Sequence, residues 1–310
     1  METLIQNILG QTTTKTNKIQ KLILLGLTRK RIAELVTNGN YGFVQNVYAK
    51  MRLQGQLGNI TQTISTNTFN RQFGVEFEAY NVEKTTLKNK LNAAGINCEI
   101  EGYNHTTRSH WKIVTDGSLT GYNTFELVSP ILKGESGLKE LKTVCRVLGE
   151  CGAKINKSCG IHVHFDAAGF DLDLWKRTYI NYARLERVID KFMPASRRNN
   201  NYCKSLKKIS NFESKINGSE NLNQMALTVF GSNRYYKINP VSYSRHNTCE
   251  FRQHSGTVEY EKISGWIKFL NNLVEFSKSN LITDATLEGL RRFNDDELVN
   301  YYKQRTIKLA

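Results

Sequence analysis

The sequence predicts an α+β protein: an antiparallel sheet that forms a cradle with flanking helices, and a small all-α domain ahead of it. Two features of the chain predict this class. Up to residue 54 the apolar residues recur at helical spacing, whereas after residue 72 several segments alternate apolar and polar residues with a period of two. Long helical patterns separate those segments, without the glycine-rich turns of a parallel nucleotide-binding sheet.

This change of pattern divides the chain into three parts. Residues 1–54 form the helical domain, residues 55–72 form a polar linker rich in Thr, Asn and Gln, and residues 73–310 form the large domain. The expected strands lie within residues 71–80, 109–119, 124–132, 160–168 and 248–256. The expected helices cover residues 84–94, 137–151, 172–192 and 263–281. Residues 199–223 are polar and rich in lysine and asparagine, and we expect a long mobile loop there.

The helical domain has the pattern of a helix-turn-helix. Thr28 is a suitable N-cap for a helix that begins at Arg29, and a turn over residues 37–40 leads to a second helix from Tyr41 to about Leu53. In such a unit the second helix enters the major groove of DNA. The residues expected to contact nucleic acid are Arg29, Lys30, Arg31, Tyr41, Gln45, Asn46 and Lys50. A helical hairpin used for docking or oligomerisation is the alternative.

The net charge of +15 is concentrated in two stretches. Residues 1–58 hold eight Lys and Arg against two acidic residues, and residues 195–252 hold ten against three. Either stretch is suited to phosphates of nucleic acid or of a small molecule, although a plain basic surface gives the same balance. The six cysteines form no CxxC pair, which is typical of reduced, structural thiols. The chain start lacks the features of a signal peptide, and we expect a cytoplasmic protein without membrane spans.

Acidic side chains share faces of the expected strands. Strand alternation puts Glu76 and Glu78 on one face. Two adjacent carboxylates repel each other unless a cation lies between them, although solvated surface glutamates give the same pattern. Glu126 alternates with apolar neighbours, and a turn over residues 117–123 brings it near Asp116. Asp116 taken alone, before a glycine, is more typical of a turn.

Imidazole and guanidinium groups also lie on shared faces of the expected strands. His162 and His164 alternate with apolar residues, so they line one face of their strand. Without a third histidine or a cysteine nearby, they favour a mixed carboxylate–imidazole site for Mg²⁺ or Mn²⁺ over zinc, with hydrogen-bonded core histidines as the alternative. Glu250 and Arg252 also share a face, as a metal ligand beside a phosphate clamp or as a salt bridge within the strand. Together these groups predict a cradle for two divalent ions and a polyphosphate.

Five segments resemble, in order, the signature segments of the amidoligase family, which belongs to the glutamine synthetase and glutamate–cysteine ligase superfamily. They are GVEFE, the W…DGSL…FELVSP stretch, CGIHVHFD, RYYKIN and TCEFRQHSGT, and the resemblance covers roughly residues 71–285. It implies a glutamine-synthetase-like cradle and an amidoligase-like catalytic domain over residues 73–310. The implied metal ligands are Glu76, Glu78, Glu126, His162 and Glu250. Arg234, Asn239 and Arg252 are the implied contacts to the cofactor, and Asp116 and His164 lie by implication on the substrate side.

The resemblance also implies an activity: an ATP- and Mg²⁺-dependent carboxylate–amine ligase, with Mn²⁺ as the alternative ion. A substrate carboxylate would take the γ-phosphoryl group of ATP, and an amine would displace phosphate to give an amide. The substrates would be small-molecule or peptide acids and amines. A homo-oligomer is compatible with the sequence. Members recur in phages, which would place this protein in the host cytoplasm. Two other classes stay open: a metal-dependent hydrolase or phosphotransferase, and a DNA-binding regulator whose large domain senses a ligand.

Overall fold

The computed structural model describes residues 2–25, 27, 29–53 and 69–309. The chain divides into two compact units, residues 1–67 and 68–310, and each has its own hydrophobic cluster. The predicted N-cap Thr28 and the predicted linker up to residue 68 lie outside the described residues. The last residues of the 55–72 segment are described, and Phe69 packs against Phe73 in the core of the larger unit, with ring centroids 5.4 Å apart.

The small unit is all-helical, as the apolar spacing predicts. Its helices are α1 (Glu2–Leu9), α2 (Lys15–Leu24), α3 (Arg29–Thr37) and α4 (Tyr41–Leu53). The last three pack together around a buried cluster that includes Ile19, Leu22, Ile32 and Val44. The N-cap of α2 is Thr14, whose hydroxyl accepts a hydrogen bond from the backbone N–H of Asn17 at 3.2 Å.

The turn between α3 and α4 is fixed by its own residues. Asn38 and Gly39 have φ angles of 51° and 87°, a left-handed backbone that glycine and asparagine tolerate best. The hydroxyl of Thr37 donates to the carbonyl oxygen of Ala33 at 2.9 Å. The side chain of Asn40 accepts from the backbone N–H of Phe43 at 3.1 Å, so α4 has a capped start. The predicted helices and turn of this segment are therefore present.

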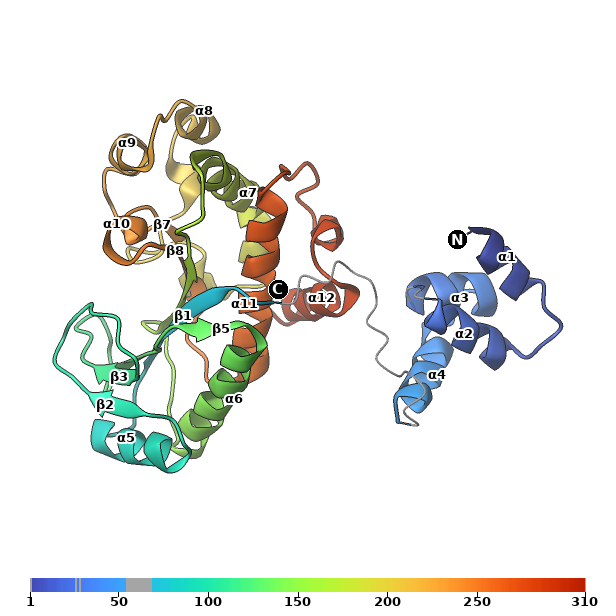
Figure 1. Ribbon diagram of the computed structural model, residues 1–310, viewed down its shortest axis with the longest axis horizontal. Coiled ribbons are helices and arrows are strands. Elements are labelled where there is room, and N and C mark those ends of the chain that lie inside the picture. The colour runs from blue at the N-terminus through green and yellow to red at the C-terminus, as the bar shows by residue number, and fades with distance from the viewer. Residues whose placement is uncertain (1, 26, 28, 54–68, 310) are drawn as a thin grey trace. The chain divides into compact units, whose positions relative to one another are not determined.

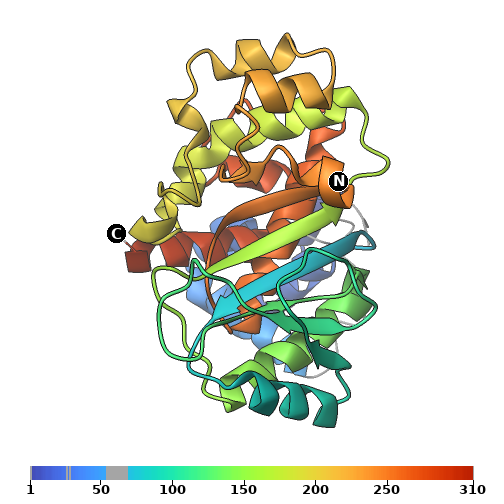
Figure 2. The same cartoon turned by 90° about the vertical axis from the view of Figure 1, so that its left-hand side faces the viewer.

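The larger unit is built on one sheet whose strands lie in the order β2-β3-β4-β1-β6-β8-β7, with β5 paired to β1 (Figure 2). All neighbours are antiparallel except β2 and β3. The strand bounds are β1 (Gln72–Ala79), β2 (Cys98–Ile100), β3 (Trp111–Val114), β4 (Phe125–Val128), β5 (Leu132–Lys133), β6 (Gly160–Asp166), β7 (Ile238–Asn239) and β8 (Thr248–Ser255). The predicted α+β class is confirmed, and β2, β5 and β7 are additions to the predicted strands.

The alternation in the strands separates a core face from a polar face. Val75, Phe77, Ile161, Val163 and Phe251 belong to one buried cluster, together with residues of the long helices. Those helices are α5 (Lys84–Ala93), α6 (Gly134–Glu150), α7 (Leu172–Lys191) and α11 (Tyr260–Ser277), and α6 and α11 lie beside one another along the sheet (Figure 1). Because helices cover the core face, the charged residues of the same strands are left on the other face.

The segment 199–223 is not the long loop that its polar composition predicts. It contains a 3₁₀ turn at Leu206–Lys208, α8 (Phe212–Asn217) and the start of α9 (Leu222–Thr228). The apolar residues scattered among its lysines are buried, and they anchor the segment to α7. The remaining elements are α10 (Ser242–His246), α12 (Asp296–Leu309) and the 3₁₀ turns Ala195–Arg197 and Gly289–Arg292. None of the described helices is long and apolar enough to span a membrane.

A β-bulge interrupts the pairing of β6 with β8. Ile161 lies opposite His254 and Val163 opposite Phe251, so two residues of β8 face the single residue His162. One of the two is Gln253, which is fully buried.

A buried polar network holds Gln253 against the helical layer. Its amide donates to Asp190 at 2.6 Å and accepts from the Tyr182 hydroxyl at 2.6 Å, both on α7. Lys237 joins the network through Asp190 at 2.6 Å and Glu186 at 2.8 Å. A buried ammonium is tolerated here because two carboxylates surround it.

His254 gives the larger unit a predictable response to acid. Its ring is 1% exposed and lies 5.6 Å from that of Trp266. Burial, with Arg305 nearby, lowers the pKa of His254 from 6.5 to about 3. The folded state therefore disfavours the protonated ring, and its stability falls as the pH drops from about 6.5 towards 3, by up to about 1.4 kcal/mol per pH unit.

We predict that His254→Leu reduces this acid sensitivity, because leucine has no proton to bind. Below pH 6, the difference between the free energies of urea unfolding of the variant and the parent should shift in favour of the variant by about 1 kcal/mol per pH unit. Measurements at pH 7.5, 6 and 5 provide the comparison. Parallel curves for the two proteins would show that the His254 ring titrates as it does in the unfolded chain.

Candidate functional site

The register of four strands collects the charged residues of the polar face. Glu76 pairs with His162 across β1 and β6, and Glu78 pairs with Glu126 across β1 and β4. On the next strand, Glu250 of β8 pairs with His164. Residues directly opposite one another share a face of a sheet, so these side chains meet above β1, β4, β6 and β8. They line a cavity of about 260 Å³.

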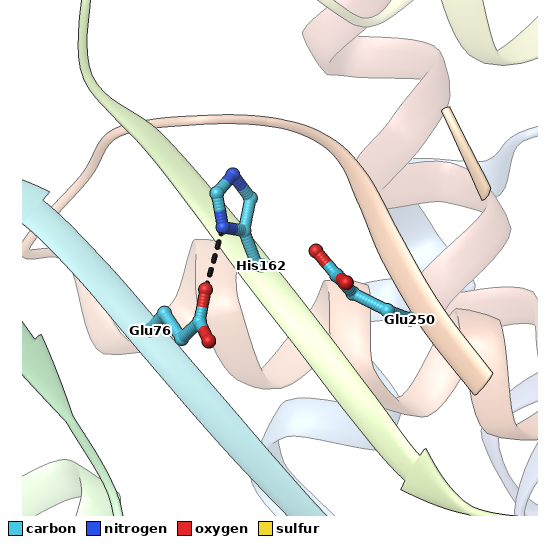
Figure 3. Close-up of side chains that lie close together, drawn as sticks. All are labelled: Glu76, His162 and Glu250. Carbon is cyan, nitrogen blue, oxygen red and sulfur yellow. Dashed lines mark hydrogen bonds and ion pairs between the residues drawn. The ribbon is translucent and has the colours of Figure 1, made fainter. Parts of the chain in front are cut away.

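Glu76 lies between two imidazoles at the centre of the cavity. One carboxylate oxygen is 2.7 Å from Nδ1 of His162 (Figure 3). The other is 3.3 Å from Nε2 of His164. Glu250 projects towards the same place from β8. Burial raises the pKa of the Glu76 carboxyl, but His164 and His162 outweigh it and hold the pKa well below 4.5. Glu76 is therefore a carboxylate at neutral pH.

Glu250 is also held as an anion. Nη1 of Arg252 lies 2.5 Å from one of its oxygens, and the amide of Asn239 donates to the other at 2.5 Å. Burial opposes ionisation, yet Arg252 and His164 lower the pKa of Glu250 below its ordinary value. The salt bridge within the strand, one of the two interpretations of the sequence, is present, and the phosphate clamp stays a prediction. Both hydrogen-bonding groups of Asn239 are in use, because its oxygen accepts from the backbone N–H of Val241 at 2.9 Å.

The end of the cavity near β4 has an excess of negative charge. Glu78 is 6% exposed and accepts from the backbone N–H of Gly160 at 2.5 Å, so it is not a solvated surface residue. Burial raises the pKa of the Glu126 carboxyl well above 4.5, and the charges of Glu76, Glu78 and Asp116 raise it further. Asp116 itself caps a turn, accepting from the backbone N–H of Ser118 at 2.7 Å. A bound cation would remove this mutual repulsion.

Two groups of side chains have the geometry of a metal site. Glu76, His162 and Glu250 form one, and Glu78, Glu126 and His162 form the other; in each, one ligand atom per residue lies within 4.8 Å of the others. Carboxylate oxygens dominate both groups, which suits Mg²⁺ or Mn²⁺. The repulsion at Glu126 is an independent sign that the site fits cations. The predicted metal ligands are thus brought together in two adjoining groups.

Every other predicted residue of the large unit also lines the cavity. These are Asp116, His164, Arg234, Asn239 and Arg252. Nδ1 of His164 lies 2.9 Å from the hydroxyl of Thr248, while its Nε2 is buried and makes no hydrogen bond of good geometry. Burial lowers the pKa of His164, but Glu250 and Glu76 raise it above 6.5 overall. His164 therefore carries a proton more readily than a free histidine does.

Arg197 also lines the cavity, and the sequence did not predict it as a site residue. It is 2% exposed, and its guanidinium donates to the backbone carbonyl oxygens of Arg252 and Gln253 at the bulge. A Cβ atom on Gly160 would lie 2.8 Å from Nη2 of Arg197, so a glycine is needed beside this guanidinium. Arg197 stands in a short 3₁₀ turn with no strand alternation, and no local pattern marked it.

Three further residues line the cavity: Lys112, His105 and His246. The Nζ of Lys112 donates to the carbonyl oxygen of Thr106 at 2.8 Å and to the side chain of Asn104 at 2.9 Å, which holds the loop before β3. His105 on this loop lies 6.3 Å from His246 of α10, measured between ring centroids. Burial lowers the pKa of both imidazoles, helped at His105 by Arg234 and at His246 by His164. Only the strand position of Lys112 was visible in the sequence.

Comparison with known proteins identifies the family of the chain. Residues 69–274 match a protein family described as "Putative amidoligase enzyme", and the chain belongs to that amidoligase family. A search of curated proteins gives no match. A crystal structure of a "novel glutamine synthase homolog" is similar, with a TM-score of 0.36 and 12% sequence identity. The similarity covers 77% of this chain but 64% of the other, less than two thirds of its length.

Because Glu126 is repelled by its acidic neighbours, replacing it should stabilise the larger unit and weaken metal binding. Without metal at pH 7.5, Glu126→Gln should stabilise the larger unit by about 1–2 kcal/mol, because an amide does not repel its three acidic neighbours. The gain should vanish near pH 4.5, since a carboxyl with a raised pKa costs stability only above its unfolded value. Thermal unfolding in EDTA measures it.

The same experiment with MnCl₂ tests the metal site. The melting temperature of the parent should rise with Mn²⁺, and that of Glu126→Gln should rise less, because a ligand oxygen is lost. Glu99→Gln is the control, since Glu99 is half-exposed and pairs with Lys88 at 2.7 Å outside the cavity. Equal shifts in all three proteins would exclude Glu126 from the metal site.

Proposed function

We propose that this protein is an ATP- and Mg²⁺-dependent ligase that joins a carboxylate to an amine through an acyl phosphate. One observation supports the proposal above all: five acidic and imidazole side chains and a half-buried arginine from four strands converge on one cavity. Membership of the amidoligase family supports the same reaction class.

The acidic residues would hold the metal. Glu76, His162 and Glu250 would bind one ion, and Glu78 and Glu126 would bind the second. When bound, Mg²⁺ or Mn²⁺ supplies positive charge to the phosphate oxygens as the γ-phosphoryl group moves. The chain keeps Glu76 and Glu250 ionised in the absence of the metal, so these ligands need not lose a proton to bind it.

The arginines would hold the phosphate groups of ATP. Arg252 is fixed by Glu250, and its guanidinium carbon lies 5.8 Å from the ring centre of Tyr235. The guanidinium carbon of Arg234 lies 5.0 Å from the centre of the same ring, so two guanidinium groups pack against one aromatic side chain. Positioned cations of this kind stabilise a transferring phosphoryl group without moving during the reaction. Asn239 acts here through Glu250, whose orientation it fixes.

The second half-reaction needs a proton acceptor for the amine. His164 is poorly suited, because Glu250 and Glu76 raise its pKa and favour the charged ring. It is better suited to stabilise negative charge on the acyl phosphate. Asp116, at the Glu126 end of the cavity, is the acceptor that we propose. The amine would then attack the acyl carbon, phosphate would leave, and Asp116 would take the proton of the new amide nitrogen.

ATP turnover separates this proposal from its alternatives. The purified protein, with Mg²⁺, a panel of carboxylic acids and hydroxylamine, should release ADP and form a hydroxamate, because hydroxylamine traps an acyl phosphate. A phosphotransferase that acts on nitrogen would give ADP without hydroxamate, because its product is not an acyl phosphate. A metal-dependent hydrolase, or a regulator that only senses a ligand, would give neither product, and that result would refute the ligase.

We predict that Glu76→Gln and Glu250→Gln each lower ADP release by about 100-fold or more, because each removes a metal ligand and with it transition-state stabilisation. Arg252→Lys should lower it as well, since an ammonium cannot make the same pair of contacts as a guanidinium. Melting curves show whether each variant is folded. Glu99→Gln, outside the cavity, serves as the control, and a Glu76→Gln protein with full turnover would remove Glu76 from the ligand set.

A further inference from the structure

The small unit lies outside the amidoligase match and has no place in the proposed reaction. Its charge is one-sided. Between Lys15 and Leu53 the chain holds eight Lys and Arg and one acidic residue, Glu34. That residue is already paired with Arg31, at 3.5 Å. A folded surface with this balance attracts polyanions over distances of about 10 Å at ordinary salt concentrations.

The helices of the small unit have the connectivity of a DNA-binding helix-turn-helix. α2, α3 and α4 pack on one another, and a short turn with two left-handed residues, Asn38 and Gly39, separates α3 from α4. In this motif the second helix lies in the major groove and the first crosses the DNA backbone. Here α4 would be the second helix and α3 the first.

The start of α3 is fastened to α4. Nη1 of Arg29 donates to the side-chain oxygen of Gln45 at 2.8 Å, and its guanidinium lies 4.6 Å from the ring centre of Tyr48. Arg29 and Gln45, two of the residues predicted to contact nucleic acid, therefore brace the two helices. This contact fixes the angle at which α4 is presented, which a reading helix requires.

The outer face of α4 suits base edges and phosphates. Val44, Val47 and Met51 are its buried side. The exposed positions include Tyr41, 40% exposed, together with Asn46 and Lys50. Asparagine and lysine side chains pair with purine edges in the major groove, and lysine also neutralises phosphates. No Asp or Glu lies within α4 to repel the nucleic acid.

We infer that the small unit binds double-stranded DNA, with α4 in the major groove and Lys30 and Lys50 on phosphates. DNA is favoured over an acidic protein partner because α4 offers hydrogen-bonding side chains at its exposed positions, next to the exposed ring of Tyr41. DNA is favoured over duplex RNA because the major groove of A-form RNA is too deep and narrow for side chains to read. The inference is independent of the ligase reaction.

Fluorescence anisotropy with the full-length chain tests the inference. The probes are a labelled 20-base-pair DNA duplex of mixed sequence and the RNA duplex of the same sequence. If about four side chains contact phosphates, affinity for DNA should fall roughly 100-fold between 50 and 200 mM NaCl. The RNA duplex should bind at least about tenfold more weakly, and methyl green, a major-groove ligand, should displace the protein from DNA.

Point variants locate the contact. Lys30→Gln and Lys50→Gln should each weaken DNA binding about three- to tenfold and reduce the slope of log affinity against log salt by about 1. Lys139→Gln, on an exposed position of α6 in the larger unit, makes the same charge change and should have no effect. All three lysines are exposed, so the variants should melt like the parent.

Three results would overturn the inference. The first is no binding of either duplex at 50 mM NaCl, which would leave the surface to a protein partner. The second is equal affinity for the RNA duplex. The third is full DNA binding by Lys30→Gln and Lys50→Gln, which would transfer the contact to the basic stretch 195–252 of the larger unit.

Discussion

The pairing of β1 with β6 is the constraint on which the site depends. Glu76 faces His162 because Val75 and Phe77 are buried with Ile161 and Val163 on the other side of the same two strands. A slip of one residue would exchange the two faces, burying the carboxylates and exposing the apolar side chains. Core packing and ligand geometry are therefore specified by one register, and the hydrophobic face maintains the polar one.

Charge is distributed unevenly along this polar face. Near β8, Arg252 and His164 compensate Glu250 and Glu76, and those carboxylates stay ionised. Near β4, burial and three acidic neighbours outweigh the charge of Arg252, and the pKa of Glu126 rises. The negative charge of the site is therefore compensated near β8 and in excess near β4. The excess charge near β4 destabilises the folded protein, and a bound cation would remove this destabilisation.

The sequence revealed strand faces better than it revealed connections. Period-two alternation placed Glu76, Glu126 and His162 correctly, because a half-buried strand constrains every second residue. Arg197 could not be found in this way, since it lies in a 3₁₀ turn and reaches the site only through the tertiary fold. α8 and α9 were missed because lysine and asparagine outnumber the few apolar residues that anchor them. Arg29 and Gln45 looked like free surface residues until packing joined them.

The bulge in β8 has a consequence for how the length of this strand can vary. Gln253 is one of the two residues that face His162, and its side chain reaches Asp190 and Tyr182 on α7. A chain without it would keep β6 and β8 paired on both sides, with Arg252 still beside Glu250. Such a chain would lose the hydrogen bonds that join β8 to α7. Position 253 is thus a point where a related chain can gain or lose rigidity without changing its ligands.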